Sequence, residues 1–544
     1  MDENGGSLQG KVIRKTALSQ PRGLGLSPAV RVEPGVAALL PPLRDGAGLT
    51  VLDIDAEKLY DVILSRDRRF DGRIFVGVSS TRIYCRPVCT VRPPQFKNCT
   101  FYRTAAAAEA AGFRPCLRCR PELAPGSVAP VDAVSRLAAL AIRRIEDGAL
   151  SGLSIEQLAA EFGVTDRHLR RVIRQEAGLT PVELAQTQRL LLAKQLLTDT
   201  GMTITEAAFS AGFESLRRFN TAFKDRYRLT PTSLRRATDT AKVDTDDAYR
   251  FSLAVRPPFD LAPLLGFWEA RATPGVEQVA DGWYRRTAVV GDRAGWVAIG
   301  PGQKPHTVQV FVSTELGPVL PSVLSRLKAM LDVRADPIGV MERLKDDPLL
   351  APLLEQWPGV RVPGAFDGFE CGIRAILGQQ ISVRAATTMA GRLAHRFGRV
   401  IEAPYGSLTI AFPSPESLAV SSIDDIQALG LTTKRAETIK AFAIAVAEGT
   451  VRLEPGADPD RVRAGLLALP GIGDWTAEYL LLRAVGWPDA FPASDLGLVK
   501  ASGLSPAELR VRADRWRPWR GYAAILLWQS LGGVGDRRHK GGNT

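Results

Sequence analysis

Four closely spaced cysteines are the residues of this 544-residue chain whose types suggest chemistry most directly. They form two pairs, Cys85 with Cys89 and Cys116 with Cys119, and only two other cysteines occur in the sequence. Two such pairs can supply four thiolates to one tetrahedral zinc ion. The spacing therefore predicts a single four-cysteine zinc site. A purely structural zinc staple and a set of free thiols are the alternatives to a reactive centre.

A second stretch that suggests function is LLALPGIGDWTAEYLLLRAVG, at residues 466–486. Two apolar helical runs flank PGIG, and Gly471 and Gly473 predict a hairpin too tight for side chains. Backbone N–H groups at the start of the second helix can hold a phosphate there. An ordinary tight turn between helices is the alternative. Downstream, FPASDLGLVKASG places Asp495 in a short loop before another helical run.

The elements that position these residues belong to several domains, because 544 residues exceed what one core supports. A hydrophobic fraction of 45% and a charged fraction of 24% are typical of soluble globular proteins. The sequence has no apolar run of roughly 18 residues and no secretory signal, which favours a reducing cytoplasm and no membrane partner. The formal net charge of +12 favours a nucleic acid as partner.

The order of helical and strand-like patterns predicts a multidomain fold. YRFSLAV, WYRRTAVV, GWVAIGP and HTVQVFVS predict strands, whereas helical periodicity dominates 131–236 and 366–532. We expect a disordered extension at 1–50, a small α/β zinc module at 51–125, an all-α DNA-binding domain at 131–237, a linker at 238–248, an α+β subdomain with an antiparallel sheet at 249–364, an all-α helix-hairpin-helix domain at 365–535 and a basic tail at 536–544.

Two stretches of the first helical domain share one plan. LSIEQLAAEFGVTDRHLRRVIRQEAG and MTITEAAFSAGFESLRRFNTAFKDRYRLTP each begin with a capping residue, Ser154 or Thr203. Each continues through a short helix and a turn at Gly163 or Gly212 into a second helix rich in basic and polar residues. A single pattern of this kind is often a plain helical hairpin. Two in tandem predict a double helix-turn-helix domain.

FVGVSSTRIYCRPVC and FYRTAAAAEAAGFRPCLRCRPELAP resemble the N-terminal module of the Ada adaptive-response proteins, over about 53–125. The resemblance implies that the Cys85 thiolate irreversibly accepts a methyl group from a DNA methylphosphotriester. The transfer would bring a zinc cluster of about −2 to about −1 and lessen its repulsion from DNA phosphate. The arginines expected to offset the remaining charge and grip the backbone are Arg82, Arg86, Arg92, Arg114, Arg118 and Arg120.

The tandem helix-turn-helix pair resembles the DNA-binding domain of the AraC/XylS family over about 131–236. The resemblance implies that each second helix enters a major groove of double-stranded promoter DNA. It also implies RNA polymerase as a partner when the chain acts as an activator. The residues expected to face DNA are Thr165, Arg167, His168, Arg170 and Arg171 in the first unit, and Ser215, Arg217, Arg218 and Asn220 in the second.

LLGFWEAR, FECGIRAILGQQISV, LGLTTKRAETI and RWRPWRGYAAILLWQ, together with the hairpin, resemble the AlkA-type 3-methyladenine DNA glycosylases II over about 249–532. The resemblance implies that Asp495 stabilises the positive charge that develops on the sugar of a flipped nucleotide. It further implies that Trp475, Tyr479 and Trp528 form a pocket for cationic alkylated purines. Core packing is the alternative for these aromatics. Because Trp475 stands where bifunctional members carry a lysine, we expect a monofunctional enzyme.

Two positions depart from the AlkA pattern. The residue expected to fill the gap left by the flipped base is Gln380, whereas the family uses an apolar side chain, so Gln379 and Ile381 remain alternatives. Ser494 stands where AlkA has a second carboxylate, which leaves Asp495 as the acting group.

These expectations combine into a fused protein of the alkylation-damage response. It would accept methyl groups on Cys85, activate transcription once methylated and excise alkylated bases. One alternative is a repair enzyme that uses the helix-turn-helix pair as a nonspecific DNA clamp. Another is a transcription factor with an inactive C-terminal half.

Overall fold

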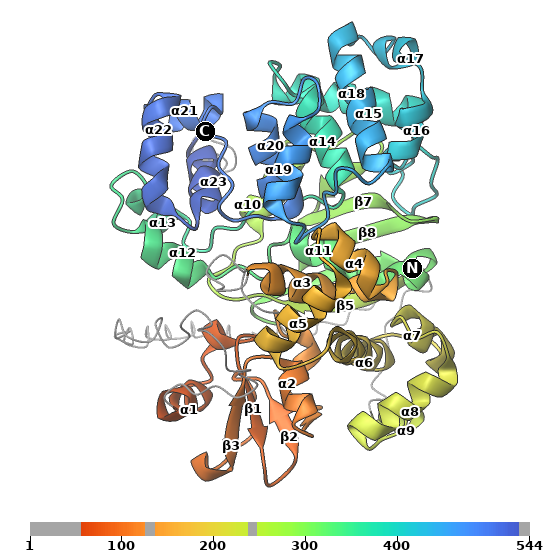
Figure 1. Cartoon of the computed structure of the whole chain (residues 1–544), viewed down its shortest axis with the longest axis vertical. Coiled ribbons are helices and arrows are strands. Elements are labelled where there is room, and N and C mark those ends of the chain that lie inside the picture. The colour runs from red at the N-terminus through yellow and green to blue at the C-terminus, as the bar shows by residue number, and fades with distance from the viewer. Residues whose placement is uncertain (1–55, 126–135, 238–246, 532–544) are drawn as a thin grey trace, which may run out of the picture.

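The computed structural model of this chain describes residues 56–125, 136–237 and 247–531. The expected extension, the basic tail and all but the last two residues of the expected linker lie outside these ranges. In Figure 1 the N-terminal module lies at one end of the molecule and the C-terminal helices lie at the other.

The N-terminal module is a four-stranded sheet with helices around it, as its α/β pattern predicts. The strand order is β3-β1-β2-β4, in which β1 pairs antiparallel with β2 and β3, and β2 pairs parallel with β4. A turn at 79–82 folds the alternating stretch RIFVGVSSTRIYC into a hairpin of two strands. The elements are α1 (Ala56–Leu64), β1 (Phe75–Val78), β2 (Ile83–Cys85), β3 (Cys99–Tyr102), α2 (Ala105–Ala110), β4 (Arg114–Pro115) and the 3₁₀ turn η4 (Pro121–Leu123).

The second part is all helical and contains both expected helix-turn-helix units. Ser154 and Thr203 each form a reciprocal capping box, and Gly163 and Gly212 take φ of +65° and +87°. Both turns therefore need glycine, as predicted. The helices are α3 (Arg136–Glu146), α4 (Ile155–Glu161), α5 (Asp166–Ala177), α6 (Pro181–Asp199), α7 (Ile204–Ser210), α8 (Leu216–Tyr227) and α9 (Pro231–Ala237).

The third part is an antiparallel sheet of order β5-β9-β8-β7-β6, and its four predicted strands are confirmed. The short strand β6 was not expected. One hydrophobic core includes Phe219 of the second helix-turn-helix unit and Val310 of this sheet. The elements are β5 (Ala248–Ala254), α10 (Ala262–Glu269), β6 (Glu277–Ala280), β7 (Trp283–Val290), β8 (Arg293–Pro301), β9 (Thr307–Ser313), the 3₁₀ segment η7 (Thr314–Val319) and α11 (Leu320–Met330).

The fourth part is helical, and with it the predicted fold class is confirmed. Its core includes the fully buried side chains of Phe442, Leu480 and Leu526. The helices are α12 (Pro337–Leu344), α13 (Ala351–Gln356), α14 (Gly368–Leu377), α15 (Val383–Phe397), α16 (Pro415–Val420), α17 (Ile423–Gln427), α18 (Thr433–Ala447), α19 (Pro459–Leu467), α20 (Asp474–Leu480), the π-helical segment η8 (Leu481–Val485), α21 (Leu496–Ser502), α22 (Pro506–Ala513) and α23 (Arg520–Ser530). Within the described ranges, no helix is both long and apolar enough to cross a membrane.

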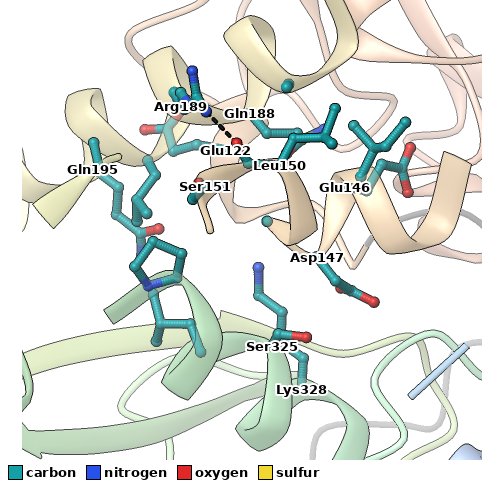
Figure 2. Close-up of a pocket in the computed structure, with 17 residues that line it drawn as sticks. Glu122, Glu146, Asp147, Leu150, Ser151, Gln188, Arg189, Gln195, Ser325 and Lys328 are labelled. Atoms are coloured by element: carbon teal, nitrogen blue, oxygen red, sulfur yellow. Dashed lines mark hydrogen bonds between the residues drawn. The ribbon is translucent and has the colours of Figure 1, made fainter. Parts of the chain in front are cut away.

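Ion pairs join these parts to one another. Lys194 of α6 lies 2.6 Å from Glu122 of the N-terminal module, and both side chains are almost fully buried. Arg334, which follows α11, lies 2.6 Å from Asp147, which follows α3. Figure 2 shows a cavity of about 70 Å³ at this junction, lined by Glu122, Asp147 and Lys328 among others. The first three parts thus contribute residues to one junction.

Candidate functional site

The four predicted cysteine ligands meet in one cluster. The parallel pairing of β2 with β4 brings Cys85 and Cys116 to the same edge, where the Cys116 N–H donates to the Tyr84 carbonyl at 3.0 Å. All four Sγ atoms, including those of Cys89 and Cys119, lie within 4.8 Å of one another. A tetrahedral zinc with bonds of about 2.3 Å places its sulfurs roughly 3.8 Å apart. The donor set and its size fit one four-cysteine zinc site.

The electrostatics of the cluster call for a cation. Hydrogen bonding to Cys116 and Cys119 raises the pKa of the Cys85 thiol, so four thiolates need a positive ion among them. Arg86 supports the cluster from inside, because its N–H donates to Cys119 Sγ at 3.3 Å and its guanidinium pairs with Asp71. Arg86 is 7% exposed, which contradicts its expected role as a grip on the DNA backbone.

The Asp495 carboxylate is held by three hydrogen-bond donors. It caps α21, where Oδ1 accepts the Leu498 N–H at 3.0 Å. The indole N–H of Trp528 donates to Oδ1 and that of Trp475 donates to Oδ2, each at 2.8 Å. Three donors suit an acceptor-only anion and fix its orientation. The side chain is half-buried, so a substrate can approach it.

The three predicted pocket aromatics gather beside Asp495. The rings of Trp475 and Tyr479 stack with centroids 5.3 Å apart, and Trp528 meets Tyr479 edge-on at 6.2 Å. All three side chains are half-buried, and both indoles turn their N–H groups to the carboxylate. The three rings form one cluster beside the carboxylate and also pack against the core of the fourth part, so their role as a base pocket stays a prediction.

Three further residues at this pocket had no role assigned from the sequence. Arg483 donates to the Tyr479 hydroxyl at 2.7 Å, and its guanidinium lies 4.4 Å from the Phe267 ring centroid. Arg271 lies 3.8 Å from the same ring centroid. Burial lowers the pKa of Arg271 to about 10. LLGFWEAR contains two of these residues, but only the fold shows that α10 reaches the pocket.

Only one of the two hairpin positions requires glycine. Gly471 has φ of +81°, and a Cβ there would lie 2.1 Å from Thr438 Oγ1. Gly473 has an ordinary φ of −101°, and a Cβ there would meet no atom within 4 Å. The expected tightness is confirmed for Gly471 and wrong for Gly473, whose exposed backbone leaves room for a DNA phosphate instead.

The segment expected to fill the gap left by a flipped base lies beside the hairpin. Gln379 is tied down, because its amide donates to the Gly471 carbonyl at 3.1 Å and to Thr476 Oγ1 at 3.2 Å. Gln380 is exposed and has φ of +60°, a strained conformation for a residue with a side chain. Ile381 is also exposed. Gln380 and Ile381 therefore remain the candidates for the residue that fills the gap.

On the first recognition helix, α5, only some of the side chains expected to face DNA are exposed. Arg167 and Arg171 are exposed on α5. Arg170 lies 3.4 Å from Glu156 and 3.5 Å from Asp166, so its charge is shared within the unit. Thr165 caps α5 by accepting the His168 N–H at 3.3 Å, and its hydroxyl is committed to the backbone.

The second recognition helix, α8, leaves the expected polar residues exposed. Arg217 and Asn220 are exposed, and Arg218 pairs loosely with Glu214 at 3.8 Å. Ser215 caps α8 by accepting the Arg218 N–H at 3.4 Å. These side chains lie on one helix, as a groove-reading element requires.

The first helix-turn-helix unit also contacts the C-terminal helical part. A Cβ at Gly163 would lie 1.5 Å from a guanidinium nitrogen of Arg461, so this arginine covers the turn between α4 and α5. Arg452 lies 3.3 Å from Glu161 at the end of α4. The unit thereby docks on α19 and on the loop that contains Arg452, which the sequence patterns do not link to it.

Four families match the chain. "Metal binding domain of Ada" matches 58–122, "Helix-turn-helix domain" matches 158–237, "AlkA N-terminal domain" matches 250–367, and "HhH-GPD superfamily base excision DNA repair protein" matches 373–504. The four matched segments correspond in order to the four structural parts.

Curated relatives match both halves of the chain. A Mycobacterium tuberculosis protein named "Probable bifunctional transcriptional activator/DNA repair enzyme AlkA" is 42% identical over 486 residues, 88% of this chain and 97% of that protein. "DNA-3-methyladenine glycosylase 2" of Escherichia coli is 37% identical over 285 residues, 52% of this chain and 98% of that protein. "Bifunctional transcriptional activator/DNA repair enzyme Ada" of Escherichia coli is 32% identical over 157 residues, 29% of this chain and 42% of that protein.

Proposed function

The chain belongs to the family of the bifunctional transcriptional activator/DNA repair enzymes AlkA, and on this premise we propose that it joins three activities on DNA. It accepts methyl groups from DNA methylphosphotriesters, regulates transcription once methylated, and excises alkylated purines as a 3-methyladenine-type DNA glycosylase. The observation that carries the glycosylase is the pair of indole N–H groups that hold the Asp495 carboxylate beside an aromatic pocket.

Asp495 is the proposed catalytic carboxylate. The target nucleotide leaves the stack while N–H groups near Gly473 hold a backbone phosphate and Gln380 fills the gap. As the bond between C1′ and the base nitrogen breaks, the ionised carboxylate stabilises the positive charge on the sugar. Water then supplies the hydroxyl on C1′ and an abasic site remains. Because position 475 is Trp475, no lysine is there to form a Schiff base.

The aromatic pocket supports a preference for alkylated purines. N-alkylation at N3 or N7 gives the base a positive charge and makes it a better leaving group. The stacked rings of Trp475 and Tyr479 can attract such a base by cation–π interaction without a tight hydrogen-bonding fit.

Cys85 is the proposed methyl acceptor. Zinc bound by the four cysteines would keep this thiolate deprotonated at neutral pH. The Cys85 sulfur forms a bond to the methyl carbon, the bond between that carbon and the phosphate oxygen breaks, and a phosphodiester anion is released. The side chain is 6% exposed, so the DNA backbone must approach the cluster closely.

The helix-turn-helix pair is the proposed regulatory element. Arg167 and Arg171 on α5 and Arg217 and Asn220 on α8 are exposed, which supports contact with DNA by both units. We infer that RNA polymerase is the partner of the methylated form and that the protein acts on the nucleoid in the bacterial cytoplasm. The alternative is a nonspecific clamp that only assists repair.

One experiment tests the chemical proposals together. The full-length zinc-loaded protein is incubated with methylated DNA, its peptides are analysed by mass spectrometry, and released bases are measured in parallel. We expect one methyl group on the peptide that contains Cys85 and release of 3-methyladenine. A methyl group on another cysteine would overturn the assignment of Cys85, and absent base release would overturn the glycosylase.

The regulatory proposal needs a separate measurement. DNase footprinting on the gene's own upstream DNA compares the unmethylated protein, the methylated protein and a Cys85→Ser variant. A sequence-selective footprint that appears only after methylation supports the regulator. Equal and nonselective protection by all three forms supports the clamp.

A further inference from the structure

Several arginine contacts dock the first helix-turn-helix unit on the C-terminal helical part. The guanidinium of Arg136, at the start of α3, lies 4.4 Å from the Trp487 ring centroid and 3.1 Å from a carboxylate oxygen of Asp460. At the end of α4, a carboxylate oxygen of Glu161 lies 3.3 Å from a guanidinium nitrogen of Arg452. These contacts hold α3 and α4 against α19 and against the loop that precedes it.

The docking places Arg461 of α19 on the turn between α4 and α5. Gly163 forms that turn with φ of +65°, and a Cβ there would lie 1.5 Å from one guanidinium nitrogen of Arg461 and 2.2 Å from its Cζ. The turn therefore needs glycine for two reasons, its left-handed backbone and the space that the arginine occupies. Because α5 begins three residues later, at Asp166, the guanidinium lies beside the first turn of the recognition helix.

The charge of Arg461 is not balanced within the protein. Its side chain is exposed, and among the described residues it forms no ion pair and no hydrogen bond. Glu161, the acidic residue at the end of α4, is already paired with Arg144 at 3.0 Å and with Arg452. The five N–H donors of the Arg461 guanidinium are therefore available to an acceptor that comes from outside the chain.

The second helix-turn-helix unit also has an arginine at its turn, but that arginine has a structural role. A Cβ at Gly212, the matching glycine, would lie 3.4 Å from Arg189 Nε. Arg189 belongs to α6 of the same domain, is half-buried and donates to the Leu150 carbonyl. It therefore supports the turn from inside the domain, whereas Arg461 comes from the C-terminal half and has its donors unused.

The position of Arg461 favours a DNA phosphate as its partner. In helix-turn-helix proteins the N-terminal residues of the second helix contact base edges, which brings the preceding turn close to the backbone of one strand. Arg167 and Arg171 are exposed on α5, so the recognition helix itself presents positive charge. A further guanidinium at the start of this helix gains free energy by displacing counterions from a phosphate and by donating hydrogen bonds to it.

We propose that the C-terminal half takes part in regulatory DNA binding, and that Arg461 contacts a backbone phosphate beside the base pairs that α5 faces. The proposal goes beyond the proposed function, which assigns regulatory DNA contacts to the helix-turn-helix pair alone, and it rests on that function because α5 must bind DNA. The same helix, α19, leads into the hairpin that contains Gly471 and Gly473. One helix of the repair half thus completes the DNA-binding surface of the regulatory half.

The test is quantitative footprinting of the full-length, zinc-loaded and methylated protein on the gene's own upstream DNA at several salt concentrations. Arg461→Met removes the charge, and Arg461→Lys keeps it. Arg399→Met is the matched control, because Arg399 is also exposed and its side chain forms no ion pair or hydrogen bond within the described ranges. Arg399 follows α15, a helix that lies apart from α5 in Figure 1. Single-turnover base release from methylated DNA is measured in parallel at saturating protein.

We expect Arg461→Met to weaken protection of the upstream DNA by about 3- to 10-fold. The slope of log affinity against log salt concentration should become shallower by about 0.9, the value for one lost phosphate contact. Arg461→Lys should keep most of the affinity and the slope of the parent protein, and Arg399→Met should match the parent in both. Base release should be the same in all four proteins.

Three outcomes would overturn the proposal and leave the proposed function standing. The first is an unchanged affinity and slope in Arg461→Met. The second is weaker protection with the slope of the parent protein, because that pattern shows that the arginine only holds the docked unit in place. The third is an equal loss of base release, which would assign Arg461 to the DNA of the repair site. If the parent protein protects no upstream DNA at all, the regulatory function fails, and the proposal fails with it.

Discussion

The zinc cluster and the Asp495 pocket are built in opposite ways. The ligands of the cluster come from one short segment, and two paired strand ends are enough to bring Cys85 and Cys116 together. The pocket draws on α10, α20, α21 and α23, which are far apart in the chain. A centre whose thiolate reacts only once needs no more than four sulfur ligands at the right distance from the metal. A site that catalyses repeated turnovers must also enclose the base and fix the orientation of its carboxylate. Here those two tasks draw on side chains from several helices of the C-terminal part.

The largest effect is expected from a substitution that removes methyl transfer at the zinc cluster and leaves base release at the Asp495 pocket unchanged. Cys85→Ser should abolish methyl transfer to the protein, because serine provides no thiolate. Base release should remain at the parent rate, since Cys85 is no part of the pocket. Methyl transfer is measured by mass spectrometry and base release by chromatography on the same samples. Cys99→Ser, outside the cluster, is the control. A matching loss of base release would show that the two centres are not independent.

The reciprocal change breaks the second centre. Asp495→Asn keeps the size of the side chain but removes the charge that faces the sugar, and we expect base release to fall by about 10²- to 10³-fold. Methyl transfer to Cys85 should be unchanged. Asp424→Asn, exposed on α17 and outside the pocket and the hairpin, is a matched control that should behave as the parent protein. An unimpaired Asp495→Asn variant would remove the carboxylate from the mechanism.

A smaller effect is expected from removing the indole N–H groups that hold the Asp495 carboxylate. Trp475→Phe keeps an aromatic ring but deletes the N–H that donates to Asp495 Oδ2. A hydrogen bond to a charged group contributes about 1.5–3 kcal/mol, so single-turnover base release should fall roughly 10- to 100-fold. Trp528→Phe should give a similar loss because it deletes the donor to Oδ1. Trp283→Phe, on the sheet, should have no effect on the rate. A full rate in both pocket variants would show that the indole donors are dispensable.

The contrast between the two centres also explains what could be predicted from the sequence. The spacing of Cys85 and Cys116 predicted a zinc site because its geometry is local, and Gly163 marked a turn because its left-handed backbone is local too. The roles of Gln379 and Arg483 could not be predicted, since each depends on a partner in a distant helix or loop. The expected domain limits remain predictions.

Gly471 and Gly473 allow a test, within one hairpin, of what the sequence pattern can and cannot predict. Both looked alike in PGIG, yet a Cβ at Gly471 meets Thr438 of α18 and one at Gly473 meets nothing. Gly471→Ala should lower the free energy of unfolding by more than about 1 kcal/mol, because alanine is strained at positive φ. Gly473→Ala should leave stability unchanged and weaken binding to undamaged duplex DNA, since its methyl group would stand where a phosphate approaches.

Thermal unfolding and fluorescence titration with a labelled duplex separate the two effects. If Gly473→Ala binds DNA as tightly as the parent protein while Gly471→Ala is destabilised, the hairpin is only a tight turn between helices. Loss of DNA binding by Gly473→Ala at full stability assigns the exposed N–H groups to the phosphate. In that outcome, glycine at position 473 would be required by the bound DNA and not by any packing in the free protein.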